Sequence, residues 1–95
     1  MTPRTRTRAA RYTPVDTVAH RRIEGQTLLL SADEDGLLTL NASGEFIWRR
    51  VVLGRDVDAI VRAFQRQFRV SPQIATRDVR AFLDMLLRRR LIRRA

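Results

Sequence analysis

The spacing of hydrophobic residues along this chain changes from a period near two to a period near 3.6, and the change falls at Asn41. Before Asn41, short runs of apolar and β-branched residues occupy 17–24, 27–31 and 37–40, and glycine-containing turn sequences separate them. Runs of this kind are typical of short strands joined by tight turns. We therefore predict a three-stranded antiparallel meander over this part of the chain.

Three amphipathic helices are predicted after Asn41. Asn41 suits the cap before the first helix and Gly54 suits its end, while Asp56 and the Ser71-Pro72 pair suit the starts of the second and third. Gly44 lies inside the first turn, where it costs up to about 1 kcal/mol relative to Ala, so we expect a neighbouring group to approach it closely. The predicted inward stripes are Ile47, Trp48, Val51 and Val52, then Val57, Ile60, Val61, Phe64 and Phe68, then Val79, Phe82, Leu83 and Leu86.

The order of elements predicts an α+β fold: a small winged-helix-like domain with a three-stranded antiparallel sheet followed by three helices (β-β-β-α-α-α). Residues 1–14 alternate Thr, Arg and Pro with little to bury, and we interpret them as a disordered basic N-terminal tail. Residues 15–95 then form a single domain, which Leu91 and Ile92 close at its end.

The charge of the chain is strongly positive, with a formal net charge of +9. All 19 basic residues are arginine. Selection for phosphate contact alone would rarely exclude lysine, since both residues bind phosphate, so a GC-rich coding bias is the simpler cause. Three interpretations of the arginines stay open: a solvated surface, an acidic peptide or protein partner, and a nucleic-acid partner.

Residues that carry enzyme chemistry are scarce. The chain has no cysteine and one histidine, His20, which falls in the first predicted strand without a nucleophile or metal-ligand cluster beside it. The acidic turn at 33–36 lacks the length and the distal Glu of a calcium site, and no phosphate-binding glycine motif is present. We therefore predict that the protein is not an enzyme and has no catalytic residue, metal or cofactor.

The chain also lacks sequence signals for membranes or secretion. Its first residues have no apolar stretch of a signal peptide, and no apolar run approaches the ~18 residues needed to span a bilayer. We predict a cytoplasmic protein with no membrane partner.

The third predicted strand is the candidate binding surface. A small sheet has two edges, and an uncovered edge can accept an extended peptide as a further strand. Leu37, Leu38, Thr39 and Leu40 carry no charge or proline that would discourage such pairing. The alternative is that this strand is an inner one, covered on both sides.

The ordered set of motifs resembles the PqqD-like family, the peptide-recognition elements of pathways that modify ribosomally made peptides. The residues that carry the resemblance are Leu40-Asn41, Gly44, Ile47-Trp48 and Leu53-Gly54, followed by DVDAIVRAF and DVRAFLDML in the second and third helices. The likeness covers roughly residues 18–92.

The resemblance implies a non-catalytic peptide chaperone that binds the leader segment of a precursor peptide and presents it to a modifying enzyme. In the family the leader lies as an added strand between the third strand and the third helix. The enzyme is a radical S-adenosylmethionine enzyme, as in pyrroloquinoline quinone biosynthesis, or a leader protease, as in lasso peptide systems.

On a helical wheel, one flank of the third helix holds Asp78, Ala81 and Met85, and its outer face holds Arg77, Asp84 and Arg88. Which flank faces the strand stays open, and the arginines would suit an acidic leader. The alternative for the carboxylates is pairing with nearby arginines on a solvated face. The predicted peptide-binding residues are Leu37, Leu38, Thr39, Leu40, Arg77, Asp78, Ala81, Asp84, Met85 and Arg88, and the predicted structural residues are Asn41, Gly44, Ile47, Trp48 and Gly54.

One position departs from the family pattern. Arg90 stands where the family has glycine after the last helix. Either Arg90 adopts the left-handed conformation at a cost of about 1 kcal/mol, or the helix runs on. Two other functions are kept as alternatives: a winged-helix nucleic-acid-binding protein, disfavoured because the arginines are spread over the chain, and an oligomerisation subunit such as a homodimer.

Overall fold

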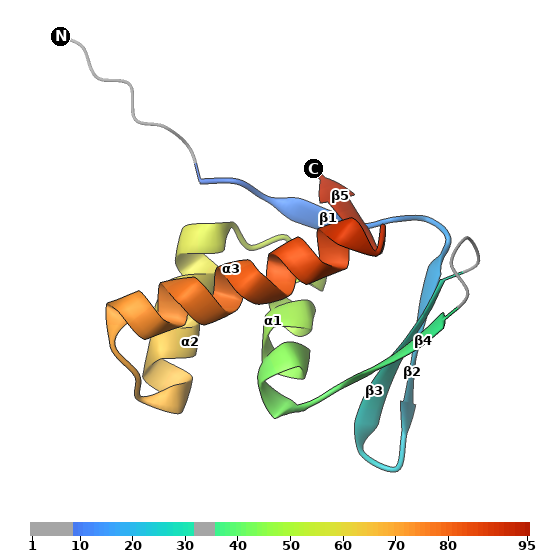
Figure 1. Ribbon diagram of the computed structural model, residues 1–95, viewed down its shortest axis with the longest axis horizontal. Coiled ribbons are helices and arrows are strands. Elements are labelled where there is room, and N and C mark those ends of the chain that lie inside the picture. The colour runs from blue at the N-terminus through green and yellow to red at the C-terminus, as the bar shows by residue number, and fades with distance from the viewer. Residues whose placement is uncertain (1–8, 32–35) are drawn as a thin grey trace, which may run out of the picture.

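Three helices and two small sheets make up the part of the chain that this computed structural model describes, residues 9–31 and 36–95 (Figure 1). The α+β class with a three-stranded antiparallel sheet and three helices is confirmed, and the predicted elements lie close to their expected bounds. Most of the acidic turn at 33–36 falls outside the described residues. The elements are β1 (Tyr12–Pro14), β2 (Val18–Ile23), β3 (Gln26–Ser31), β4 (Gly36–Leu40), α1 (Ala42–Val52), α2 (Val57–Phe68), α3 (Pro72–Arg88) and β5 (Ile92–Arg94).

The larger sheet has the strand order β2-β3-β4, with antiparallel pairing throughout. In the β3–β4 register Thr27 is opposite Leu40, and Leu29 is opposite Leu38. These four residues share one face of the sheet, because side chains alternate along a strand. Thr27, Leu29 and Leu40 are buried and Leu38 is half-buried, so this face covers the hydrophobic core.

The three predicted N-caps are confirmed. The side-chain oxygens of Asn41, Asp56 and Ser71 each accept a hydrogen bond from the backbone N–H three residues later, at 2.8–3.1 Å. Each cap satisfies a donor that the first helical turn leaves without an intrahelical partner. The proline at position 72 follows as the first residue of α3.

Helix α1 lies at the centre of the fold and packs against α2, α3, β1 and β4. The predicted core is largely confirmed, but Val52 is wrong: its side chain is 47% exposed. Val51 in the same turn is buried, so Val52 lies on the outer side of the helix, and helical spacing alone does not bury it. The buried hydrophobic residues are Leu29, Leu40, Ile47, Trp48, Val51, Val57, Ile60, Phe64, Ala75, Val79, Leu83, Leu86, Leu91 and Ile92.

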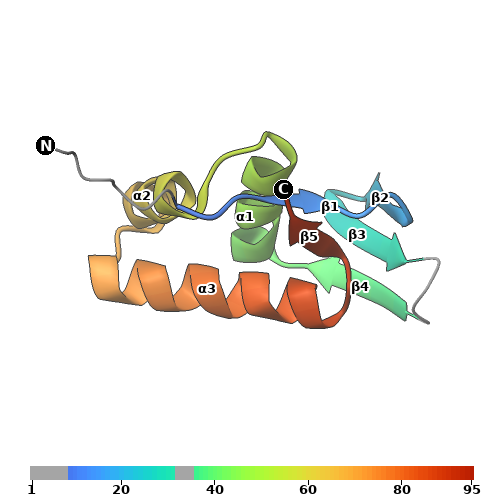
Figure 2. The ribbon, with the colours of Figure 1, turned by 90° about the horizontal axis from the view of Figure 1, so that it is seen from above.

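The two ends of the described chain pair with each other, which the sequence interpretation missed. Strand β1 pairs antiparallel with β5, with Thr13 opposite Arg93 (Figure 2). Ala10 also accepts a backbone hydrogen bond of 2.9 Å from Val57. The prediction of a disordered tail over 1–14 is therefore wrong for residues 9–14, and residues 1–8 lie outside the described part. The pairing partner is at the far end of the sequence, so no local pattern reveals it.

The structure at the end of α3 decides between the two alternatives for Arg90. Helix α3 ends at Arg88, and Arg90 adopts the left-handed conformation with φ of 58°. The chain then turns sharply, and Leu91 and Ile92 are buried as predicted. Arg90 therefore takes the conformation of the family glycine, and the helix does not run on.

Candidate functional site

The joint between β4 and α1 fixes the position of the candidate site. Leu40 is buried at the end of β4, and Asn41, the single connecting residue, caps α1. A Cβ atom at Gly44 would lie 2.9 Å from Cε1 of Phe82 on α3, closer than carbon atoms can approach. The predicted close approach at Gly44 is thus confirmed, and it lets α3 lie against the start of α1.

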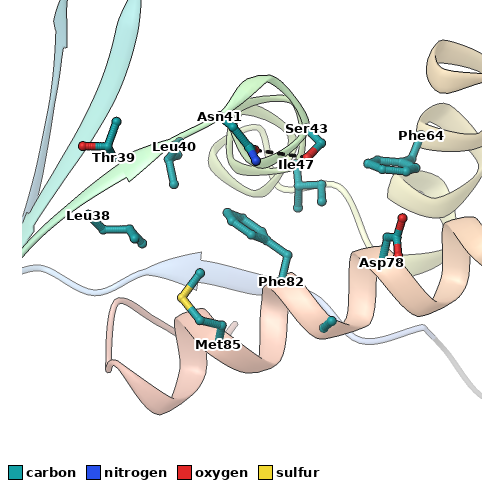
Figure 3. A pocket seen from close by; sticks show the side chains of 11 residues that line it. Leu38, Thr39, Leu40, Asn41, Ser43, Ile47, Phe64, Asp78, Phe82 and Met85 are labelled. Atoms are coloured by element: carbon teal, nitrogen blue, oxygen red, sulfur yellow. Dashed lines mark hydrogen bonds between the residues drawn. The ribbon is translucent and has the colours of Figure 1, made fainter.

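A cavity of about 450 Å³ opens between β4 and α3, beside this joint (Figure 3). Leu38 from β4 and Phe82 and Met85 from α3 point into it. We call this cavity, together with the outer edge of β4, the β4–α3 groove. Its full lining is Leu38, Thr39, Leu40, Asn41, Ser43, Ile47, Phe64, Asp78, Ala81, Phe82 and Met85.

Strand β4 is an edge strand. Within the described residues it pairs with β3 on one side only. The predicted edge position is confirmed, and the alternative of an inner strand is wrong. The outer N–H and C=O groups of β4 are therefore available to a further strand, as in other sheets with an open edge.

The structure brings together six of the ten predicted peptide-binding residues. Leu38, Thr39 and Leu40 line the groove from β4, and Asp78, Ala81 and Met85 line it from α3. The flank of α3 that holds Asp78, Ala81 and Met85 is therefore the one that faces β4. Four predicted residues do not line the groove, namely Leu37, whose side chain is 55% exposed, and Arg77, Asp84 and Arg88.

Several lining residues were not among the predicted peptide-binding residues. Phe82 was assigned to the core alone, but it is half-buried and lies four residues after Asp78 on the same flank. That spacing is the signal that would have placed it in the groove. Asn41 and Ile47, predicted as structural, also line the cavity, as do Ser43 and Phe64.

The polar groups of the groove are few. Asp78 is its one ionisable lining residue; its side chain is 43% exposed, and its Oδ1 atom accepts a hydrogen bond from Nε of Arg77 at 3.2 Å. Asp78 therefore pairs with Arg77, as the alternative interpretation expects, and it also lines the groove. The Asn41 Oδ1 atom already accepts from the Gly44 N–H and the Ser43 hydroxyl. The groove thus offers mainly apolar surface, with one carboxylate on its wall.

Other chemistry is not apparent in the described residues. No group of three or more His, Cys, Asp or Glu side chains among them could hold a metal ion. No described helix is both long and apolar enough to cross a membrane. His20 lies in β2, and its ring and the Trp48 ring form a T-shaped contact at a centroid distance of 6.1 Å.

The family model described as coenzyme PQQ synthesis protein D (PqqD) matches residues 26–92. No curated protein matches the chain significantly. Among solved structures, TbiB1 in complex with the TbiA(beta) leader peptide is 28% identical, with a TM-score of 0.78 over 84% of this chain and 93% of that one. A lasso peptide synthetase B1 complexed with the leader peptide shares the fold, at 17% identity and a TM-score of 0.81 over 88% of this chain and 99% of that one.

Proposed function

Because the chain belongs to the PqqD family, we propose that it binds the leader segment of a ribosomally made precursor peptide in the β4–α3 groove. The observation that carries this proposal is the open edge of β4 beside a largely apolar cavity. The two similar solved structures are described as complexes with leader peptides, which supports the same class of ligand.

The leader would bind as an added strand on β4. Main-chain hydrogen bonds to the edge give such binding most of its affinity, and pockets for alternate side chains give it specificity. The five residues of β4 span about 17 Å, enough for a short extended segment. Every second side chain of that segment would enter the cavity toward Leu38, Phe82 and Met85, so large apolar residues at alternate positions are the expected recognition pattern.

Asp78 adds a polar element to this recognition. Its carboxylate lies on the cavity wall, and within the described residues its ion-pair partner is the exposed Arg77. A basic or hydrogen-bond-donating side chain of the leader would bind there, and an acidic one would be repelled. The arginines expected to favour an acidic leader, Arg77 and Arg88, lie outside the lining.

The protein would act as a non-catalytic chaperone in the cytoplasm, where precursor peptides are made, and would present the leader to a modifying enzyme. The family description points to pyrroloquinoline quinone synthesis and so to a radical S-adenosylmethionine enzyme. The similar lasso peptide synthetase points to a leader protease. The precursor and enzyme genes that accompany this chain decide between the two pathways.

An NMR titration with the leader peptide encoded beside this chain tests the proposal. We expect the backbone resonances of residues 38–40 and 78–85 to shift in a saturable way, because these segments form the two walls of the groove. The proposal fails if no neighbouring leader perturbs these residues.

Paired substitutions place the ligand in the groove. Met85→Glu puts a carboxylate into apolar surroundings, which costs several kcal/mol on peptide binding, so the dissociation constant should rise by about 30-fold or more. Arg88→Glu on the same helix introduces the same carboxylate outside the lining, and leader affinity should change less than about threefold. Equal losses in the two variants would mean that the leader binds elsewhere.

A further inference from the structure

A second hollow lies between the β2–β3 hairpin and α1, with a volume of about 500 Å³. It shares no lining residue with the β4–α3 groove. His20 and the buried Trp48 line it, and Val52 and Leu53 at the end of α1 are 47% and 64% exposed. These are the apolar residues that the helical pattern of α1 leaves facing outward.

Three of the polar side chains that line this hollow, Arg22, Thr27 and Glu45, form hydrogen bonds and an ion pair with one another. The Glu45 carboxylate accepts a hydrogen bond from Oγ1 of Thr27 at 2.8 Å and forms an ion pair with Arg22. Its side chain is only 18% exposed. Because Glu45 already has these partners, it contributes little negative charge to the adjacent surface.

Next to this hollow lies a cluster of three arginines, Arg49, Arg50 and Arg55, that no ion pair joins to a carboxylate in the described residues. An adjoining depression of about 410 Å³ shares Glu45, Arg49 and Leu53 with it and adds Arg50 and Arg55. The Arg50 guanidinium stacks 3.5 Å above the centre of the Phe46 ring. Within residues 9–31 and 36–95, ion pairs join Arg22 to Glu45 and Arg77 to Asp78, and none reaches the three clustered arginines.

The central member of the cluster, Arg50, is partly buried and has two positively charged neighbours. The pKa of Arg50 is lowered from its usual value by partial burial and by the positive charges of Arg49 and Arg55. A carboxylate brought to this surface would offset that repulsion, and it would be partly shielded from water by the neighbouring apolar side chains.

We propose that this surface docks the modifying enzyme, through an acidic segment that inserts one large apolar side chain beside Trp48 and Leu53 and places carboxylates on Arg49 and Arg55. We call these residues, with His20, Val52 and Arg50, the α1 face. The proposal rests on the proposed function, because a chaperone that presents a leader must hold peptide and enzyme together. The absence of shared lining residues between the groove and the α1 face permits this.

Two other occupants fit the α1 face less well. A second copy of the chain would bring a net charge of +9 toward the arginine cluster, and like charges across an interface are unfavourable. A nucleic acid would neutralise the arginines through its phosphates but would leave Val52 and Leu53 facing water. An acidic segment with an apolar anchor satisfies both parts of the surface.

The test uses a synthetic probe, the peptide acetyl-DEELFEDE-amide, and the full chain. Trp48 is the only tryptophan of the chain and lines the hollow, so its fluorescence reports binding there. We expect saturable binding, with shifts at backbone residues 48–55 and none at 38–40. Leu53→Asp and the pair Arg49→Glu/Arg55→Glu should each weaken the probe by about 10-fold or more.

The matched control is Arg62→Glu/Arg66→Glu, which makes the same change in net charge at two exposed positions of α2 outside the α1 face. Probe affinity should fall less than about threefold in this control, as for screened surface charges. A loss equal to that of the Arg49/Arg55 pair would mean non-specific attraction and would overturn the proposal. Leu53 is exposed, so Leu53→Asp should leave the thermal midpoint nearly unchanged.

The remaining outcomes separate this inference from the proposed function. If the precursor leader perturbs β4 and α3 but the probe leaves Trp48 unaffected, peptide binding stands and the α1-face proposal falls. If Leu53→Asp dissociates a dimer in sedimentation, a second copy of the chain occupies the α1 face and the proposal is wrong. The proposal is also wrong if the probe does not bind and the Arg49→Glu/Arg55→Glu substitutions abolish binding of a DNA duplex. If the probe binds but no leader does, the proposed function is wrong. The proposal that the α1 face docks a modifying enzyme is then wrong as well, because it rests on that function.

Discussion

The two edges of the β2-β3-β4 sheet differ in what they offer a partner. Strand β4 has no charged residue or proline, and in the described part of the chain it pairs with β3 on one side only. Strand β2 carries Arg21 and Arg22, charges of the kind that discourage strand addition, and Arg22 is tied back to Glu45 on α1. The β4 edge is suited to backbone pairing with a peptide. The β2 edge borders a surface that would contact a partner through side chains.

The hollow beside each edge matches this difference. The β4–α3 groove combines an open backbone edge with apolar side chains and one carboxylate, so it suits an extended peptide. The α1 face combines exposed apolar side chains with three arginines and suits the acidic surface of a folded partner. Under the two proposals, one small domain would hold two partners by different physical means, and each prediction below separates the two.

The largest expected difference concerns backbone hydrogen bonds. A leader peptide with one N-methylated amide at the centre of its bound segment loses a hydrogen bond to β4, which should weaken binding by about 10- to 100-fold. The same modification in the acidic probe should change its affinity for the α1 face by less than about twofold, because side chains carry that contact. Isothermal titration measures both. If N-methylation leaves the affinity of the leader unchanged, the leader does not bind by strand addition to β4.

The second expected difference concerns salt. Contacts between carboxylates and exposed arginines are screened as ionic strength rises, so the affinity of the acidic probe should fall about 10-fold between 50 and 500 mM NaCl. Leader binding relies on backbone bonds and apolar burial, and we expect a change of less than about threefold over the same range. Similar salt dependence at the two sites would remove the distinction between them.

A smaller effect is expected from Gly44→Ala. The new methyl group must displace the end of the Phe82 ring, which lines the groove. Leader affinity should then fall about fivefold, while the gain in helix propensity keeps the change in unfolding free energy within about 1 kcal/mol. Binding of the acidic probe should not change.

The control for this prediction is Gly54→Ala. Gly54 has a φ of 82° and open space around it, so the substitution strains the backbone and lowers stability by about 1 kcal/mol. Leader affinity should stay as in the unmodified chain. If it falls as much as in Gly44→Ala, general destabilisation rather than the position of Phe82 is the cause.

Local patterns were enough to predict most of the fold. Alternation predicted β2, β3 and β4, and caps such as Asn41 and Ser71 predicted where helices begin, because both signals depend on residues close in sequence. Strands β1 and β5 were missed because each has three residues and pairs with the opposite end of the chain. Such pairing is decided by tertiary packing alone.

The candidate site was predictable in its parts but not in its arrangement. The sequence identified β4 as a candidate edge, and the family resemblance placed the groove between β4 and α3 without deciding which flank of α3 faces the strand. Their meeting depends on the angle that the Asn41 joint and Gly44 give to α1 and α3, which no local pattern specifies. Because the sequence does not decide which face of α3 lies toward β4, Arg77 and Arg88 were kept among the predicted peptide-binding residues. The α1 face was missed because its arginines looked like any other part of a solvated surface.

The smallest expected effect on binding comes from Arg90→Gly, which touches neither surface. Arg90 has a φ of 58°, and glycine adopts this conformation without the strain of a Cβ atom. Unfolding free energy should rise by about 0.5–1 kcal/mol and the thermal midpoint by about 3–6 °C, with both affinities unchanged. The matched variant is Arg89→Gly, where φ is −87° and glycine brings no relief, so stability should not rise. If Arg90→Gly is instead less stable, the Arg90 side chain contributes more to the closing turn than the strain costs, and the departure from the family glycine is itself stabilising.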